Sequence, residues 1–236
     1  MSEKIAIVVQ RCHPDVVGGS ESLAWQYACL LRDHYQVEVL TTTAIRAPGW
    51  QPDLPAGAME REGVVVRHFA NLPGHTDWWQ DLHQQMLFAW RCMYDEPDLR
   101  IPNPQLHHWP LFDLPMQLQW LIQQGPYSAD LQAFIKSHYQ EYKKIIFVTY
   151  LYAPTWFGLM QLPPRTALLV PTLHDEPPAW MPIFRLAAQR AQTLLWNTQA
   201  EQSFGRLLWG AHPGQLVSMG IDLPVSPPVD HQRQRF

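Results

Sequence analysis

The chain has 236 residues, a formal net charge of −4 at pH 7 and 47% hydrophobic residues. This length suffices for one α/β domain with a sizeable core and is short for two full domains with a linker. The slightly acidic balance excludes the basic surface on which nucleic-acid binding depends, so no nucleic-acid partner is expected.

The N-terminal segment and the cysteines bear on the cellular compartment. The N-terminal apolar run within MSEKIAIVVQ is about five residues long, too short for a signal peptide or a membrane span, and no transmembrane segment is expected. The three cysteines form no CxxC pair and leave one unpaired in any disulfide scheme, which favours a reducing compartment. We therefore expect a cytoplasmic protein, either free or peripheral at the inner membrane face.

The first 70 residues are typical of the opening of a doubly wound fold. Apolar, β-branched runs predict strands at residues 4–9, 37–42 and 64–69. Residues 20–32 place apolar side chains at helical spacing, so a helix is expected between the first two strands, with a right-handed crossover. The Pro-, Gly- and Ala-rich residues 47–58 are predicted to form a loop.

Residues 70–140 are less regular, and we expect an insertion there. Thr76 is the predicted cap of a helix that runs to about residue 94. Shorter helices are expected at residues 114–124 and 128–139, after a segment that Pro102, Pro104 and Pro110 punctuate.

Strand and helix patterns then alternate. Strands are predicted at residues 144–149, 166–170, 193–197 and 215–218, and helices at residues 154–160, 183–191 and 199–208. The whole pattern predicts an α/β fold, with a Rossmann-like, doubly wound, mostly parallel sheet of about seven strands in a single domain over residues 1–222. Residues 223–236 are Pro-rich without periodicity and are predicted to be a linker or tail.

The segment VVGGSES, at residues 16–22, lies between the first strand and the first helix. Gly18 and Gly19 allow close approach of a ligand, and a helix that starts at Ser20 directs free N–H groups and a positive dipole end to the same place. An anion such as a phosphate would suit this loop at the carboxyl end of a strand. The alternative is a tight turn with a serine cap. The loop is not GxGxxG, so no dinucleotide cofactor is expected.

Two further loops follow later predicted strands. His174 lies beside Asp175 and Glu176, where it could donate to a sugar hydroxyl or a leaving phosphate. From the triplet alone, a surface turn is the more common explanation. Thr198 and Glu201 fit a capping box, which accounts for both residue types structurally.

Metal binding has little support in the sequence. His107 and His108 are adjacent and cannot chelate one ion as an i, i+4 pair would, while His13 beside Cys12 has no second pair of ligands at zinc-finger spacing. The sequence also has no DxD element of the kind that holds a divalent cation in many glycosyltransferases. We expect neither a metal nor a cofactor.

The motifs together carry a resemblance to a family. KIAIVVQRCHP, VGGSES, VEVLTT, LLVPTLHDEPP, LLWNTQAEQSF and LVSMGIDLP occur in this order along the chain. In this order and spacing they resemble the N-terminal, acceptor-side domain of GT-B glycosyltransferases of family 4, also called group 1. The resemblance extends over the chain but is weak between residues 70 and 140.

This resemblance implies an activity and a set of site residues. The activity is retaining transfer of a sugar from a nucleotide-sugar donor to an acceptor, which is a glycan, a lipid or a small molecule. Gly18, Gly19 and Ser20 would contact the donor phosphate or sugar, and His174 would line the cleft beside the transferred sugar. The further cleft candidates are Glu21, Asp175, Asn197, Thr198 and Glu201.

In the family, a second Rossmann domain holds most of the donor through a basic pair and an E-x7-E element, which this sequence lacks. We therefore expect a C-terminal donor-binding domain in the same or another chain, and no activity from this chain alone. One alternative is a non-catalytic module that binds a glycan or a partner through the same cleft. A third possibility is a different α/β nucleotide enzyme.

Overall fold

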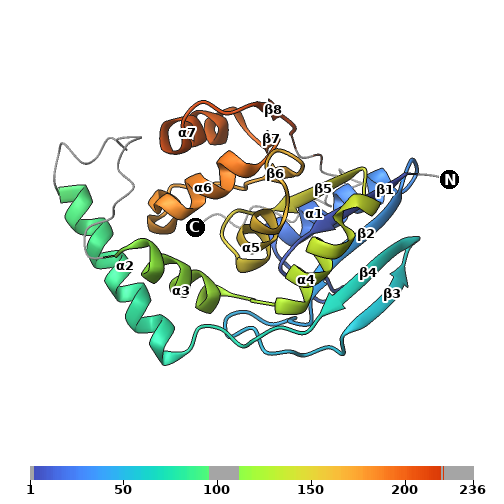
Figure 1. The fold of residues 1–236 in the computed structure, drawn as a ribbon, viewed down its shortest axis with the longest axis horizontal. Helices are drawn as coiled ribbons and strands as arrows, with labels where there is room; N and C mark the ends of the chain where they lie inside the picture. Colours follow the sequence, from blue (N-terminus) through green and yellow to red (C-terminus); the bar gives the residue numbers. More distant parts are fainter. Residues whose placement is uncertain (1–2, 96–111, 219, 221–236) are drawn as a thin grey trace, which may run out of the picture.

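The computed structural model describes residues 3–95, 112–218 and 220, in which one eight-stranded sheet has helices on both faces (Figure 1). The strands are β1 (Lys4–Val8), β2 (Gln36–Thr42), β3 (Gly57–Arg61), β4 (Val64–Phe69), β5 (Lys144–Val148), β6 (Leu168–Val170), β7 (Thr193–Trp196) and β8 (Gly214–Leu216). The helices are α1 (Gly19–Leu31), α2 (Asp77–Asp95), α3 (Leu114–Gln124), α4 (Ala129–His138), α5 (Ala153–Gln161), α6 (Pro182–Arg190) and α7 (Gln199–Trp209). Two 3-10 turns are η2 (Tyr139–Glu141) and η3 (Pro177–Trp180).

The strand order shows where a ligand can bind. It runs β3-β4-β2-β1-β5-β6-β7-β8, and every pair is parallel except β3 with β4. On one side of β1 lie β2, β4 and the edge strand β3, and on the other side lie β5 to β8, so the order reverses between β1 and β5. The predicted Rossmann-like, doubly wound, mostly parallel α/β sheet is confirmed. Ligands of such sheets bind beyond the carboxyl ends of the strands at this reversal.

The sheet has one strand more than the sequence predicted. Strand β3 is an antiparallel edge strand, and its residues 57 and 58 belong to the segment that was predicted to be a loop. Glu62 and Gly63, both with positive φ, form the two-residue turn to β4, as the twist of a hairpin favours. The predicted loop was wrong at residues 57 and 58. Strand β3 gives no strand signal in the sequence because it is exposed almost throughout and GAMER has neither β-branched residues nor a buried alternation.

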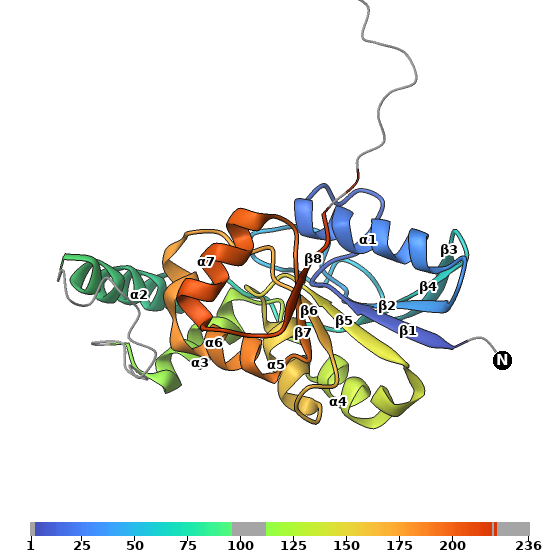
Figure 2. The same ribbon diagram turned by 90° about the horizontal axis from the view of Figure 1, so that it is seen from above.

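The central strands are buried on both faces, which explains their continuous apolar sequences. In β1, Ala6 and Val8 belong to the larger core under the helices from α2 to α7, while Ile5 and Ile7 belong to a smaller core under α1. Figure 2 shows α1 on one side of the sheet and α4 and α5 on the other. The cores fix the sheet, and therefore the relative positions of the strand ends.

The less regular middle of the chain forms α2 and α3, which pack together beside the sheet (Figure 1). The Thr76 hydroxyl accepts a hydrogen bond from the N–H of Trp79 at 3.3 Å, so the predicted helix cap is confirmed. Trp79 packs against the core, whereas the adjacent Trp78 is 48% exposed. The segment around Pro102, Pro104 and Pro110 and the predicted linker at residues 223–236 lie outside the described residues. No helix of the described part has both the length and the apolar character that a membrane crossing requires.

Candidate functional site

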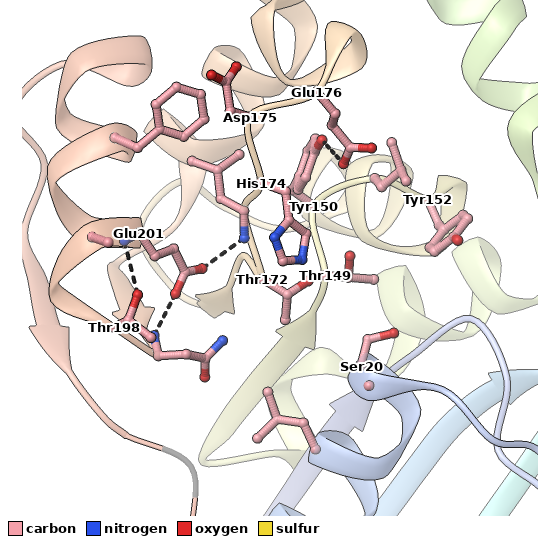
Figure 3. A pocket seen from close by; sticks show the side chains of 17 residues that line it. Ser20, Thr149, Tyr150, Tyr152, Thr172, His174, Asp175, Glu176, Thr198 and Glu201 are labelled. Atoms are coloured by element: carbon pink, nitrogen blue, oxygen red, sulfur yellow. Dashed lines mark hydrogen bonds between the residues drawn. The ribbon is translucent and has the colours of Figure 1, made fainter. Parts of the chain in front are cut away.

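A cleft of about 850 Å³ lies at the carboxyl ends of β5, β6 and β7 (Figure 3). Its walls come from the loops that follow these three strands and from the first turns of α1 and α7. This is the region beside the reversal of strand order, where an open α/β sheet binds its ligands. The cleft is large enough for a sugar or a nucleotide-sized compound.

The cleft brings together most of the residues that the sequence singled out. Seven of the nine predicted site residues line it, and they come from three separate motifs; these are Gly19, Ser20, His174, Asp175, Asn197, Thr198 and Glu201. Gly18 and Glu21 do not line it. Glu21 instead borders a smaller cavity of about 260 Å³ beside Cys12 and Trp25.

The N-terminus of α1 already has a carboxylate beside it. Glu21 is 7% exposed, and its Oε2 accepts a hydrogen bond from the Ser20 hydroxyl at 2.8 Å. Its Oε1 accepts from Arg11 Nε at 2.8 Å, and Arg11 Nη2 lies 2.6 Å from the same oxygen. The Glu21 carboxylate therefore lies at the positive end of the α1 dipole, and the Arg11 guanidinium balances its negative charge. Gly19 and Ser20 are therefore the part of the glycine loop that a ligand in the cleft can reach.

The two glycines of this loop should respond differently to substitution. A Cβ at Gly18 would lie 2.3 Å from Glu21 Oε2, whose carboxylate Arg11 and Ser20 hold in place, whereas a Cβ at Gly19 meets nothing within 4 Å. We expect Gly18→Ala to lower the free energy of unfolding by about 1–2 kcal/mol. Gly19→Ala, the matched control, should change it by less than about 0.5 kcal/mol. Urea unfolding of both variants measures this, and equal losses would contradict the described packing.

His174 is an exposed ionisable residue in the loop after β6. Its side chain is exposed, and it makes no hydrogen bond within the part of the chain that the structure describes. The neighbouring carboxylates are engaged, because Asp175 accepts from Trp180 Nε1 at 3.0 Å and Glu176 accepts from the Tyr150 hydroxyl at 2.6 Å. Burial raises the pKa of Tyr150 well above its usual value, so this hydroxyl stays protonated and donates. His174 is thus free to contact a ligand.

Glu201 connects two of the loops that form the cleft. Its Oε2 accepts a hydrogen bond from the N–H of Asn197 at 2.6 Å, and its Oε1 accepts from the N–H of Leu173 at 2.8 Å. The Thr198 hydroxyl accepts from the Glu201 N–H at 3.0 Å, which is the first half of the predicted capping box. Through Leu173, the carboxylate fixes the backbone next to His174. Figure 3 shows these hydrogen bonds along one wall of the cleft.

Several cleft residues were missed by the sequence analysis. They follow β5 and β6 or lie on α7, and they include Thr149, Tyr150, Tyr152, Thr172 and Phe204. The strand at residues 144–149 was predicted, so the rule that ligands bind beyond carboxyl ends could have pointed to Tyr150 and Tyr152. No tryptophan is among the described residues that line the cleft.

The cleft is acidic and aromatic. Its carboxylates are Asp175, Glu176 and Glu201, and no lysine or arginine is among the described residues that line it. Within residues 3–95, 112–218 and 220, no three histidine, cysteine or acidic side chains are grouped so as to hold a metal ion. The side chains offered to a ligand are therefore carboxylates, hydroxyls, an amide, an imidazole and aromatic rings.

No family model matches the chain, and no curated protein matches it. Among solved structures, the chain is similar to a sucrose-phosphate synthase from Thermosynechococcus elongatus, with a TM-score of 0.48 and 14% identity over 92% of this chain and 90% of that one. A structure described as trehalose-6-phosphate from E. coli bound with UDP-2-fluoro glucose gives a TM-score of 0.44 and 13% identity over 85% of this chain and 41% of that one. An α,α-trehalose 6-phosphate synthase from Burkholderia multivorans gives 0.44 and 12% over 87% and 42%. The chain thus spans less than half of the last two, and similarity of this degree says nothing about its ligand.

Proposed function

We propose that this chain is the N-terminal, acceptor-side domain of a retaining GT-B glycosyltransferase of family 4. The observation that carries the proposal is the single cleft in which three separate motifs meet. The glycine loop contributes Gly19 and Ser20, the loop after β6 contributes His174, and the start of α7 contributes Asn197 and Thr198. These are the places at which the family resemblance puts contacts with the sugar.

The proposed reaction transfers a sugar with retention of its anomeric configuration. The bond between the anomeric carbon and the diphosphate oxygen breaks, and a new bond forms to the acceptor oxygen on the same face. The acceptor proton passes to the leaving diphosphate. In this scheme His174 contacts the transferred sugar, while Gly19 and Ser20 at the start of α1 approach the donor phosphate or sugar.

The charge of the cleft supports the proposal that a second domain holds the donor diphosphate. A leaving diphosphate needs cationic groups, and no lysine or arginine is among the described lining residues. Arg11, the cation at the start of α1, is held by Glu21. We propose that a donor-binding domain, in the same or another chain, supplies the cations, and that it closes over this cleft.

Saturation-transfer NMR and release of nucleoside diphosphate from UDP-, GDP- and ADP-sugars test the proposal. We expect millimolar donor binding, no turnover by this chain alone, and at least about tenfold weaker binding for His174→Ala. His34→Ala is the matched control, because His34 is exposed in the turn between α1 and β2, at the amino ends of the strands and away from the cleft.

Each other outcome has a defined meaning. If the wild type turns over a nucleotide sugar and His174→Ala does not, the chain is catalytic alone and the two-domain proposal is wrong. If sugars bind but no nucleotide sugar does, the chain is a glycan-binding module. If free nucleotides bind as tightly as nucleotide sugars, a different α/β nucleotide enzyme is favoured.

A further inference from the structure

Two threonines at the strand ends have a backbone conformation that β-branched residues rarely adopt. Thr149 follows β5 directly with φ 65°, and Thr172 lies two residues beyond β6 with φ 51°. In this left-handed region a branched Cβ crowds the backbone, whereas glycine adopts it freely. Conformations of this kind persist where the surrounding structure imposes them, and they concentrate at ligand sites. Both threonines line the cleft.

Hydrogen bonds on each side hold the two residues in this conformation. The N–H of Thr149 donates to the carbonyl of Val170 at 2.9 Å, which extends the pairing of β5 and β6 past the end of β5. On either side of Thr172, Pro171 accepts a backbone hydrogen bond at 2.9 Å, and Leu173 donates to the carboxylate on α7 at 2.8 Å. The strain is therefore imposed by contacts that also shape the wall of the cleft.

Three side-chain oxygens of this wall have no hydrogen bond within the described residues. Thr149 is only 5% exposed, and neither its hydroxyl nor that of Thr172 has a hydrogen bond within the described residues. Asn197 Oδ1, on the adjacent loop, is buried and is likewise without a partner there. Buried polar atoms are normally paired, so the unpaired Asn197 Oδ1, together with the two accessible threonine hydroxyls, is suited to a ligand that brings its own hydroxyl groups. Figure 3 shows Thr149 and Thr172 next to His174 at the strand ends.

The charges and rings around these oxygens restrict the ligand further. Asp175, Glu176 and Glu201 make this wall negative, which disfavours a phosphate or carboxylate substituent. Tyr152 and Phe204 provide flat apolar surface against which the C–H groups of a sugar ring can pack. Tyr152 is itself held in place, because its ring packs edge-on against Trp50 with the ring centroids 5.3 Å apart.

We propose that Thr149 and Thr172 together recognise an uncharged polyhydroxy ring, a neutral hexose or cyclitol, by hydrogen bonds to its hydroxyl groups. The strained backbone turns both hydroxyls into the cleft, where they exchange hydrogen bonds with adjacent ring hydroxyls. This inference rests on the proposed function and names the chemical class of its acceptor.

Saturation-transfer NMR titrations with glucose, galactose, mannose and myo-inositol, and with their monophosphates, test the pair. We expect a neutral compound to bind more tightly than its phosphate. Thr149→Val and Thr172→Val keep the branched shape and remove one hydroxyl, so each should weaken binding about tenfold. Thr193→Val, at the opposite end of β7, is the matched control and should leave binding unchanged.

Thr149→Gly adds a readout that separates strain from simple contact. Glycine relieves the left-handed conformation, so this variant should unfold at a higher temperature and yet bind the neutral compound about tenfold more weakly. Arg165→Gly is its control, because Arg165 has φ 62° and lies outside the cleft. It should also unfold at a higher temperature, with binding unchanged.

The outcomes distinguish the inference from the proposed function. If a neutral sugar binds and the two valine variants bind it as tightly, the threonine pair is wrong and the proposed function stands. If a monophosphate binds more tightly than its neutral parent, the uncharged class is wrong. If neither sugars nor nucleotide sugars bind the wild type, the proposed function fails and the inference fails with it.

Discussion

Replacing Glu201 with alanine should lower the free energy of unfolding by about 3 kcal/mol, because two backbone N–H groups, one buried and one partly buried, would lose a charged acceptor. Those N–H groups belong to Leu173 and Asn197, in two different loops of the cleft. Urea unfolding measures the loss. Ser203→Ala, on the exposed side of the same helix, removes only a hydroxyl that bonds to the carbonyl of Gln199, and should change stability by less than about 0.5 kcal/mol. Equal stability of the two variants would contradict the bridging role.

Glu201→Gln should give an intermediate loss of about 1–2 kcal/mol, since the two N–H groups bond to different carboxylate oxygens and the amide replaces one of these with an NH2 group that cannot accept. Burial is the largest influence on the Glu201 carboxyl and raises its pKa, although three backbone hydrogen bonds oppose the shift. The folded state therefore binds the proton more tightly than the unfolded state. The contribution of Glu201 to the free energy of unfolding is therefore greatest below the usual glutamate pKa of about 4.3. It falls as the pH rises through the raised pKa of the folded state.

The difference in stability between wild type and Glu201→Gln isolates this pH dependence from that of the other carboxylates. Measured from pH 4 upward, the advantage of the wild type should shrink as the pH rises and then become constant. An advantage that grows with pH would mean that the hydrogen bonds outweigh burial, and that the pKa of Glu201 is lowered in the folded protein.

Replacing Gly205 with alanine should lower the free energy of unfolding by about 2–3 kcal/mol, the cost of overpacking a tight core. In an exposed helix the same change usually stabilises by about 1 kcal/mol. At Gly205, a new Cβ would lie 2.1 Å from Cη2 and 2.5 Å from Cζ3 of Trp196. Trp196 is 2% exposed and stacks on Trp209 with the ring centroids 6.3 Å apart, so its ring has no free space to enter.

Thermal unfolding and near-ultraviolet circular dichroism measure this effect, because displacement of the buried Trp196 ring changes the aromatic signal. Gly19→Ala is the control, since its Cβ would meet no atom within 4 Å. Trp196 directly precedes Asn197, so Gly205→Ala should also weaken ligand binding in the cleft. An unchanged aromatic spectrum with unchanged stability would contradict the packing of α7 on β7.

The sequence predicted the parallel strands because they are buried on both faces and their residues are almost all apolar. The run at residues 4–9 could bury all its side chains only inside a sheet with two covered faces. Local hydrogen-bonding chemistry likewise predicted the Thr76 and Thr198 caps. Strand β3 escaped prediction because an exposed edge leaves no hydrophobic pattern, and its pairing with β4 depends on the turn at Glu62 and Gly63.

The sequence by itself determined the class of fold and placed the glycine loop, His174 and the Asn197 loop after predicted strands, since burial and helix caps act over a few neighbouring residues. Tertiary structure alone decided that Glu201 bridges two loops, that Glu21 turns away from the cleft to Arg11, and that Thr149 and Thr172 are held in strained conformations. The bond from Leu173 to Glu201 and the bonds around Thr149 and Thr172 join segments that are remote in the chain, and such contacts exist only after the strands have paired. The Glu21 ion pair instead depends on how the loop between β1 and α1 folds back on the helix.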